Sequence, residues 1–293
     1  MVVTAGVRDR ARAAMLGFGV GDALGATTEF MTPVEIRHRY GVHRTLRGGG
    51  WLRLRPGQVT DDTGMLLALA EAVAESGRWD LEAIARGFVT WLRSRPVDVG
   101  ATCARGIRRF LVEGTLQAPP GEWDAGNGGA MRAPAAGIAS LSSPLAAGGR
   151  AVRQARITHN HPLSDAASAA VALMVRAAVL GLGFEAVDRV ARALGRRHPA
   201  FRATGVRPVS SPYVADTLRT VLYFLRTTRS FEECLVGVVN QGGDADTAGA
   251  IAGSLGGGLG GTAAIPRPWL RRLDPQVRDR LEVAAENLIR LGG

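Results

Sequence analysis

The sequence predicts an all-α fold. Hydrophobic residues make up 46% of the chain but aromatic residues only 5%, and Ala and Gly are abundant. Such small residues suit closely packed helices, whereas β-sandwiches favour β-branched and aromatic residues. Apolar residues recur at helical spacing, and strand-like alternation between turns is nearly absent. Because no segment resembles a domain linker or a repeat, we expect a single helical domain over residues 1–293.

The N-terminal elements follow from apolar periodicity and from helix-start signals. Residues 8–24 and 62–75 carry broad apolar faces, so each is expected to form a helix. A short helix is expected over 33–40, with proline at its first position. Residues 48–57 begin with three glycines and are expected to form a loop with some extended structure.

Further helices are expected along the rest of the chain, where the apolar runs are long and rich in Ala and Leu. They cover about 81–93, 99–112, 129–141, 163–180, 184–196, 212–226, 231–240, 246–259 and 276–291. Proline-containing loops are expected at 119–121, 142–144 and 199–212.

The charged residues exclude two kinds of chemistry. The formal net charge is +10, and all 36 basic residues are arginine. Without lysine, the chain can form neither a lysine Schiff base nor the lysine contact of a Walker phosphate loop. A basic surface favours anionic partners such as nucleotides or acidic proteins. Because there is no long basic run and no zinc-finger spacing, nucleic acid is not an expected partner.

The N-terminus and the cysteines bear on the location of the protein. Residues 1–12 show no signal-peptide pattern, and no uninterrupted apolar stretch is long enough to span a bilayer. Cys103 and Cys234 are far apart and belong to no Cys-x-x-Cys motif, which fits a reducing compartment. We expect a cytoplasmic monomer.

Two acidic clusters stand at the starts of predicted helices. One is Thr-Asp-Asp-Thr at 60–63, and the other is Asn-Gln-Gly-Gly-Asp-Ala-Asp-Thr at 240–247. Thr and Asp are good helix caps and acidic side chains suit the positive end of a helix dipole, so capping is one interpretation. A cap needs only one of these side chains, however, and each cluster offers two carboxylates and at least one hydroxyl. Metal binding is therefore the other interpretation.

The metal interpretation requires that the two clusters converge, which the sequence alone leaves as an assumption. Four carboxylates cannot be buried together without cations. A set of oxygen ligands suits Mg²⁺, Mn²⁺ or Ca²⁺, whereas zinc prefers His and Cys. Two such ions that share a carboxylate polarise a substrate oxygen and lower the pKa of a bound water.

Other segments carry candidate site residues. Asp22 lies in a glycine-rich helix end and is either an ordinary buried hydrogen-bonding residue or part of a site. Glu29 follows in a loop, where a carboxylate is a candidate base or orients a water. Residues 126–132 (Gly-Asn-Gly-Gly-Ala-Met-Arg) offer free N–H groups and Arg132 to a phosphate. His159 belongs to a pair at i,i+2, a poor zinc pattern, so we interpret it as a substrate contact rather than a metal ligand.

The order and spacing of these motifs resemble the ADP-ribosylglycohydrolase family, over nearly the whole chain. The motifs are 19–25 (Gly-Val-Gly-Asp-Ala-Leu-Gly), 60–63, 126–132, His159 and 242–247. Further stretches are most similar to the dinitrogenase reductase-activating branch of that family, namely 49–54, 94–100 and 155–162. The resemblance implies an orthogonal all-α fold with a binuclear Mn²⁺ or Mg²⁺ centre in a cleft.

The resemblance also implies roles for individual residues. Asp98 matches a position that acts on the ribose during cleavage, although its residue type alone indicates only a turn after Pro96. Glu29 matches a carboxylate near the metals. Tyr213 is either a core tyrosine at a helix start or a ring that stacks on adenine. The metal ligands would be Thr60, Asp61, Asp62, Asp244, Asp246 and Thr247. ADP-ribose would be held by Asn127, Gly128, Gly129, Met131, His159 and Tyr213.

The function implied by the resemblance is hydrolysis of ADP-ribose from an arginine side chain of a modified protein, with dinitrogenase reductase as a candidate target. The product would be free ADP-ribose. Two alternatives stay open: the same fold acting on a serine, O-acetyl-ADP-ribose or nucleic-acid linkage, or a non-catalytic ADP-ribose-binding relative. The complete acidic set argues against the second. One departure from the branch is Ala101, where Asn is common, which removes a polar contact to the substrate.

Overall fold

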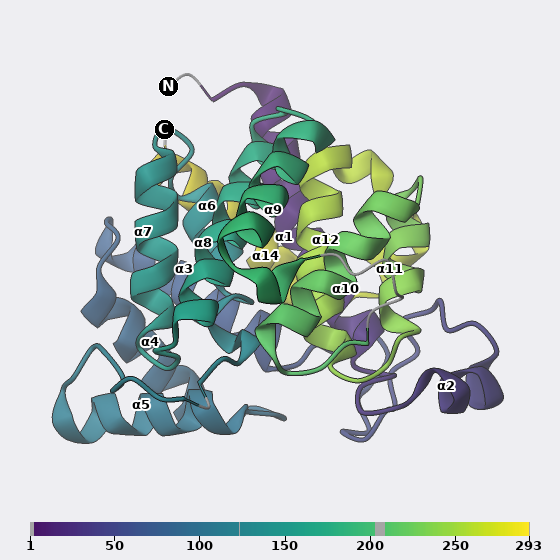
Figure 1. The fold of residues 1–293 in the computed structure, drawn as a ribbon, viewed down its shortest axis with the longest axis horizontal. Helices are drawn as coiled ribbons and strands as arrows, with labels where there is room; N and C mark the ends of the chain where they lie inside the picture. The colour runs from purple at the N-terminus through teal and green to yellow at the C-terminus, as the bar shows by residue number, and fades with distance from the viewer. Residues whose placement is uncertain (1–2, 123, 203–208, 293) are drawn as a thin grey trace.

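The computed structural model describes residues 3–122, 124–202 and 209–292, which form a bundle of helices (Figure 1). This part of the chain contains fourteen α-helices and no β-strand, only isolated bridges between Gly49 and Leu54 and between Gly126 and Tyr213. The predicted all-α fold is therefore confirmed. The helices are α1 (Ala5–Gly25), α2 (Pro33–Tyr40), α3 (Asp61–Ser76), α4 (Leu81–Arg93), α5 (Ala101–Glu113), α6 (Ala133–Ile138), α7 (Pro144–Ala155), α8 (Pro162–Val179), α9 (Phe184–Arg197), α10 (Val214–Thr227), α11 (Phe231–Val239), α12 (Ala245–Gly260), α13 (Arg267–Arg272) and α14 (Pro275–Gly292).

Two helices were not expected from the sequence, α7 and the short α13. Residues 142–143 of the expected loop lie outside any helix, but its last residue, Pro144, is the first residue of α7. Ser143 caps this helix by accepting a hydrogen bond from the Ala146 N–H, and Pro144 occupies the first helical position. Serine before proline is thus a helix-start signal here rather than a turn.

Two other expectations change in detail. The helix expected over 129–141 is only α6, because residues 127–129 first form a 3-10 turn. Of the loop expected over 199–212, residues 203–208 lie outside the described residues.

The packing of α1 against α12 brings the C-terminal end of α1 next to the N-terminal end of α12, where the second acidic cluster lies. A Cβ atom on Gly21 would lie 2.0 Å from the carbonyl oxygen of Gly249, and one on Gly17 would lie 2.2 Å from that of Gly253. The two backbones therefore touch, and only glycine fits at these crossings. Because residue numbers rise along α1 as they fall along α12, the helices are antiparallel. The end of α1 lies beside the start of α12.

Asp22, in the last turns of α1, fixes the start of α3. Its fully buried carboxylate accepts hydrogen bonds from the backbone N–H groups of Thr60 and Thr63, each at 3.0 Å. The Thr63 hydroxyl also donates to it. Asp22 is therefore a buried hydrogen-bonding residue, as one of the two interpretations held, and it joins the end of α1 to the start of α3.

The hydrophobic core extends from α1 to α14. Contrary to the expectation that no apolar stretch is long enough to span a bilayer, helix α8 is long and apolar enough to cross a membrane, by length and composition only. However, 61% of it is buried inside the fold, and the core helix of a soluble protein passes the same test. Asp165 and Arg176 also interrupt it. The helix is weak evidence for a membrane span.

Candidate metal centre

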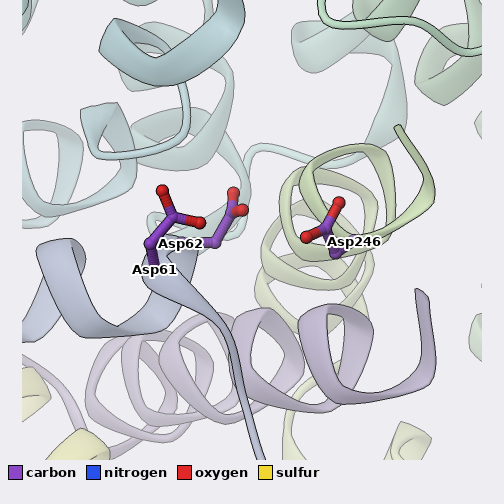
Figure 2. Close-up of side chains that lie close together, drawn as sticks. All are labelled: Asp61, Asp62 and Asp246. Atoms are coloured by element: carbon purple, nitrogen blue, oxygen red, sulfur yellow. The ribbon is translucent and has the colours of Figure 1, made fainter. Parts of the chain in front are cut away.

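The two acidic clusters meet at the N-termini of α3 and α12. Asp61, Asp62 and Asp246 each offer a carboxylate oxygen, and these oxygens lie within 4.8 Å of one another. Figure 2 shows the three side chains on the two helix starts. The Thr247 hydroxyl donates to Asp62 Oδ2 at 3.1 Å and links the clusters directly. The convergence that the sequence left as an assumption is confirmed.

The side chains at this point fit a divalent cation. Asp62 Oδ1 is buried and has no hydrogen-bond partner in the described part of the chain. A buried carboxylate oxygen without a partner is costly unless a cation or a water binds it. The donors gathered here are all oxygens, which suit Mg²⁺ or Mn²⁺ better than zinc.

A cavity of about 450 Å³ opens onto these carboxylates. Most of the predicted site residues line it, from both acidic clusters, the 126–132 turn and the loops before α5 and α8. The lining carboxylates are Glu29, Asp61, Asp62, Asp98, Asp244 and Asp246. The other predicted residues on its wall are Asn127, Gly128, Met131, His159 and Thr247.

Three of the residues assigned to the metals or to ADP-ribose are not on the cavity wall. Thr60 is buried behind Asp62, to which its hydroxyl lies 3.5 Å away. Gly129 is buried. Tyr213 is 39% exposed and forms a backbone bridge to Gly126, which does line the cavity, so the tyrosine lies beside the rim.

Asn127 connects the glycine-rich turn to the second acidic cluster. Its side-chain N–H₂ donates to Asp244 Oδ2 and to the Thr217 hydroxyl, both at 2.9 Å. The turn also packs closely on a histidine, since a Cβ on Gly128 would lie 2.7 Å from the His159 ring. Asn127 thus orients a carboxylate, and the glycine leaves room for the imidazole.

His159 is neutral in this environment. Burial, followed by the positive charges of Arg132 and Arg105, lowers its pKa to about 3. Its Nδ1 lies 2.8 Å from the Thr158 hydroxyl, and its ring lines the cavity. An uncharged imidazole there is suited to hydrogen bonding. It is also not part of the carboxylate group that could hold a metal.

The prediction that Arg132 offers its guanidinium to a phosphate is wrong. Its side chain is fully buried and bonds instead to Gln154 and Thr158, with its guanidinium carbon 4.7 Å from the centroid of the Phe88 ring. The arginine supports the glycine-rich turn from behind, because Gln154 in turn donates to the Gly129 carbonyl.

Trp51 is a site residue that the sequence did not single out. Its indole N–H donates to Glu29 Oε2 at 2.6 Å, and its ring centroid lies 5.3 Å from that of Phe30. The sequence signal that could have identified it was the run of three glycines directly before it, at 48–50. Gly50 has φ +69°, and a Cβ on it would lie 2.4 Å from the Ala26 carbonyl oxygen.

The loop that carries Glu29 is fastened to the second acidic cluster. The Phe30 N–H donates to the Gly243 carbonyl at 2.7 Å, and the Gly243 N–H donates to the Met31 carbonyl at 2.9 Å. Gly243 has φ +60°, and a Cβ on it would lie 1.9 Å from the Ser210 carbonyl oxygen. The turn therefore needs glycine, and the fastening keeps Glu29 at the cavity.

The comparisons with known proteins agree with this geometry. A family model described as ADP-ribosylglycohydrolase matches residues 3–293. The chain belongs to the ADP-ribosylglycohydrolase family. It is 50% identical, over 98% of each chain, to the ADP-ribosyl-[dinitrogen reductase] glycohydrolase of Rhodospirillum rubrum. It is 31% identical to an ADP-ribosylarginine hydrolase of Pseudomonas putida, over 90% of this chain and 74% of the other.

A solved structure gives the same result. It is described as an ADP-ribosylglycohydrolase-related protein complex and superposes on this glycohydrolase with a TM-score of 0.87. The two chains are 34% identical, and the match covers 99% of this chain and 100% of the other.

The crowded carboxylates of this glycohydrolase resist ionisation. Burial raises the pKa of Asp61 to about 7 and that of Glu29 to about 8, and neighbouring carboxylates add to both shifts. Burial raises the pKa of Asp62 and of Asp246 well above the ordinary value, again with help from the surrounding acids. Burial also raises the pKa of Asp98.

These shifts predict that the metal-free protein loses stability as the pH rises from about 5 to about 8. The ordinary pKa values of Asp61 and Glu29, 3.8 and 4.5, hold in the unfolded chain, whereas the folded values are about 7 and about 8. Between them the folded chain retains protons that the unfolded chain has released, so raising the pH favours unfolding. Thermal unfolding in EDTA across this range measures the effect.

Added Mn²⁺ provides the control for this prediction. A metal needs deprotonated ligands, so the rise in melting temperature on adding Mn²⁺ should grow with pH. A melting temperature in EDTA that climbs with pH over the same range would contradict the shifts.

Proposed function

We propose that this glycohydrolase cleaves the N-glycosidic bond between ADP-ribose and the guanidinium of an arginine in a modified protein. The observation that carries the proposal is the meeting of six carboxylates from separate segments on one cavity beside a glycine-rich turn. The similarity to an ADP-ribosylarginine hydrolase over 90% of this chain supports the arginine linkage. A non-catalytic reader would not need so many acids.

The chain's own side chains suit this reaction. Water adds to the anomeric carbon as the bond to the guanidine nitrogen breaks, and the proton that the water loses ends on the guanidine. Positive charge develops on the sugar in the transition state, and the carboxylates around the cavity stabilise it. In the proposal, Asp98 transfers the proton at the ribose or leaving group, and Glu29, held by Trp51, orients the water.

We propose that the two acidic clusters hold two divalent ions, Mn²⁺ or Mg²⁺. When bound, these would polarise a substrate oxygen and lower the pKa of a bound water. The residues assigned to them are Thr60, Asp61, Asp62, Asp244, Asp246 and Thr247.

The rest of ADP-ribose would occupy the opposite wall. The N–H groups of the glycine-rich turn suit the diphosphate, neutral His159 supplies a hydrogen bond, and the exposed ring of Tyr213 offers a stacking surface to adenine. The residues assigned to this part are Asn127, Gly128, Gly129, Met131, His159 and Tyr213.

The proposed target is a modified dinitrogenase reductase, supported by the 50% identity to the Rhodospirillum rubrum glycohydrolase that is named for that substrate. We also propose a cytoplasmic location, supported by the two cysteines, which are both buried and free.

The deciding experiment measures release of ADP-ribose from arginine-, serine- and DNA-linked substrates, with and without Mn²⁺ after dialysis against a chelator. We expect release from the arginine-linked protein that depends on Mn²⁺ or Mg²⁺. Release from the serine or DNA linkage alone would replace the proposed substrate, and full activity without metal would refute the metal centre.

Replacing Asp98 by Asn should lower kcat by about a hundredfold or more, because a positioned acid–base group contributes about that much. Mn²⁺ affinity, followed by calorimetry, should stay close to that of the wild type, because Asp98 lies outside the carboxylate group around Asp62. An unchanged kcat would remove Asp98 from the reaction, and lost Mn²⁺ binding would reassign it to the metals.

A further inference from the structure

A basic lobe lies at the mouth of the cavity. We define the basic lobe as residues 31–56, which include α2 and the glycine-rich loop. In Figure 1 the α2 helix projects away from the main body of helices. The lobe contains six arginines and one glutamate, so about a tenth of the chain carries half of its formal net charge of +10.

The positive charge of the basic lobe is not neutralised by neighbouring acids. Every one of its arginines is exposed, and none forms a salt bridge with the residues that the structure describes, whereas many arginines elsewhere do. Its one acid, Glu35, is engaged in the capping box with Thr32. Such a surface attracts anionic partners. The six arginines are Arg37, Arg39, Arg44, Arg47, Arg53 and Arg55.

A groove of about 630 Å³ connects the basic lobe to the cavity. The groove and the cavity share Glu29, Phe30 and Trp51, so these residues form the wall between them. Three apolar side chains stand exposed along it: Phe30 by 60%, Val34 by 72% and Trp51 by 51%. Arg39 lies in the same groove. Exposed aromatic and aliphatic groups beside arginine are typical of protein-binding surfaces.

The size of the cavity requires a second contact surface for a protein substrate. At about 450 Å³ it is of the size that holds a small molecule, so the polypeptide that bears the modified arginine stays outside. The basic lobe and its groove adjoin the cavity at the wall that Glu29 helps to form. Glu29 and Glu35 also line the groove, but with six arginines and one glutamate the basic lobe around it is net positive and complementary to acidic side chains.

We propose that the groove and the basic lobe dock an acidic polypeptide segment of the modified protein, next to its ADP-ribosylated arginine. The inference rests on the proposed function. Arg39 supplies charge complementarity, and Val34 with the Phe30 and Trp51 rings supplies apolar contact. The basic lobe thereby selects which modified arginines are cleaved, and the cavity alone handles the ADP-ribose.

The test compares kcat/KM for three arginine-linked substrates: a peptide with Asp and Glu around the modified arginine, the same peptide with Asn and Gln instead, and free ADP-ribosylarginine. The wild type should prefer the acidic peptide over the neutral one by about tenfold at low salt and lose this preference at high salt. Arg39→Glu should abolish the preference and leave cleavage of ADP-ribosylarginine unchanged. Val34→Ser should raise KM for both peptides.

Arg290→Glu is the matched control, because it makes the same change of charge at an exposed position of α14, outside the basic lobe. It should retain the preference for the acidic peptide. Equal kcat/KM for the two peptides in the wild type, or the same effect of Arg39→Glu and Arg290→Glu, would overturn the inference. The inference would also be overturned if Arg39→Glu lowered kcat/KM for DNA-linked ADP-ribose but not for the acidic peptide. A wild type that cleaves none of the three arginine-linked substrates would refute the proposed function itself.

Discussion

Replacing Asp62 by Asn should reduce kcat by about a thousandfold, the size of effect seen when a main electrostatic stabiliser of a transition state is removed. Asp62 Oδ1 is buried and has no hydrogen-bond partner among the residues that the structure describes, and Oδ2 accepts the hydrogen bond from Thr247 that joins the two acidic clusters. The amide keeps the shape but removes the charge that a cation requires. Steady-state cleavage of ADP-ribosylarginine and Mn²⁺ calorimetry measure the two losses.

The same substitution should make the metal-free protein more stable. Burial and the charge of Asp61 raise the pKa of Asp62 well above its ordinary value, so keeping this acid in the fold costs free energy at neutral pH. The melting temperature in EDTA should therefore rise as activity falls. Asp279→Asn, at an exposed acid of α14, is the control and should change neither the melting temperature nor the activity. Wild-type kcat in Asp62→Asn would contradict the assignment.

Replacing Gly21 by Ala should destabilise the protein by about 3 kcal/mol, at the upper end of the usual cost of overpacking. The new methyl group would lie 2.0 Å from the backbone carbonyl oxygen of Gly249, which cannot move as a flexible side chain can. Relief of this clash would separate α1 from α12 and move Asp22 away from the start of α3. Activity should fall together with stability, as urea unfolding and steady-state assays would record.

Gly149→Ala is the matched control for that prediction. Gly149 is also an interior helical glycine, in α7, but a Cβ there would meet nothing within 4 Å. Alanine should stabilise the protein by about 0.5–1 kcal/mol, because it costs less backbone entropy than glycine in a helix. If both variants unfolded at the same urea concentration, the close contact of α1 and α12 would be wrong.

The fold class could be predicted from the sequence because it depends on local pattern. Apolar periodicity and small residues are sufficient to indicate helices, and most of the expected bounds lie close to the observed ones. The start of α7 was missed because a serine followed by a proline, here Ser143 and Pro144, is compatible with two local structures. They begin a turn as readily as they begin a helix, and the difference lies in which N–H group the serine hydroxyl accepts.

The residues of the acidic site could also be predicted from the sequence, because two carboxylates at each helix start exceed the needs of a cap. The meeting of the two clusters in space could not be predicted. That depends on glycine crossings between α1 and α12, which are more than 200 residues apart in sequence. Asp22 shows the same limit, since its partners at Thr60 and Thr63 are known only once α1 and α3 are placed.

Arg132 and Trp51 mark where residue type misleads. An arginine after a glycine-rich turn resembles a phosphate ligand, but Arg132 is directed into the core toward Gln154. Conversely, a tryptophan in a glycine-rich loop carries no evident chemistry until its indole is found against Glu29. In both cases the side-chain direction, which tertiary packing decides, separates a supporting residue from one at the cavity.

Anomalous diffraction from crystals soaked in Mn²⁺ tests most directly whether divalent ions bind between the starts of α3 and α12. We predict Mn²⁺ peaks within coordination distance of Asp62 Oδ1 and Asp246, absent from Asp62→Asn crystals treated in the same way. Well-diffracting wild-type crystals with no Mn²⁺ at these carboxylates, or with Mn²⁺ only at surface acids, would contradict it.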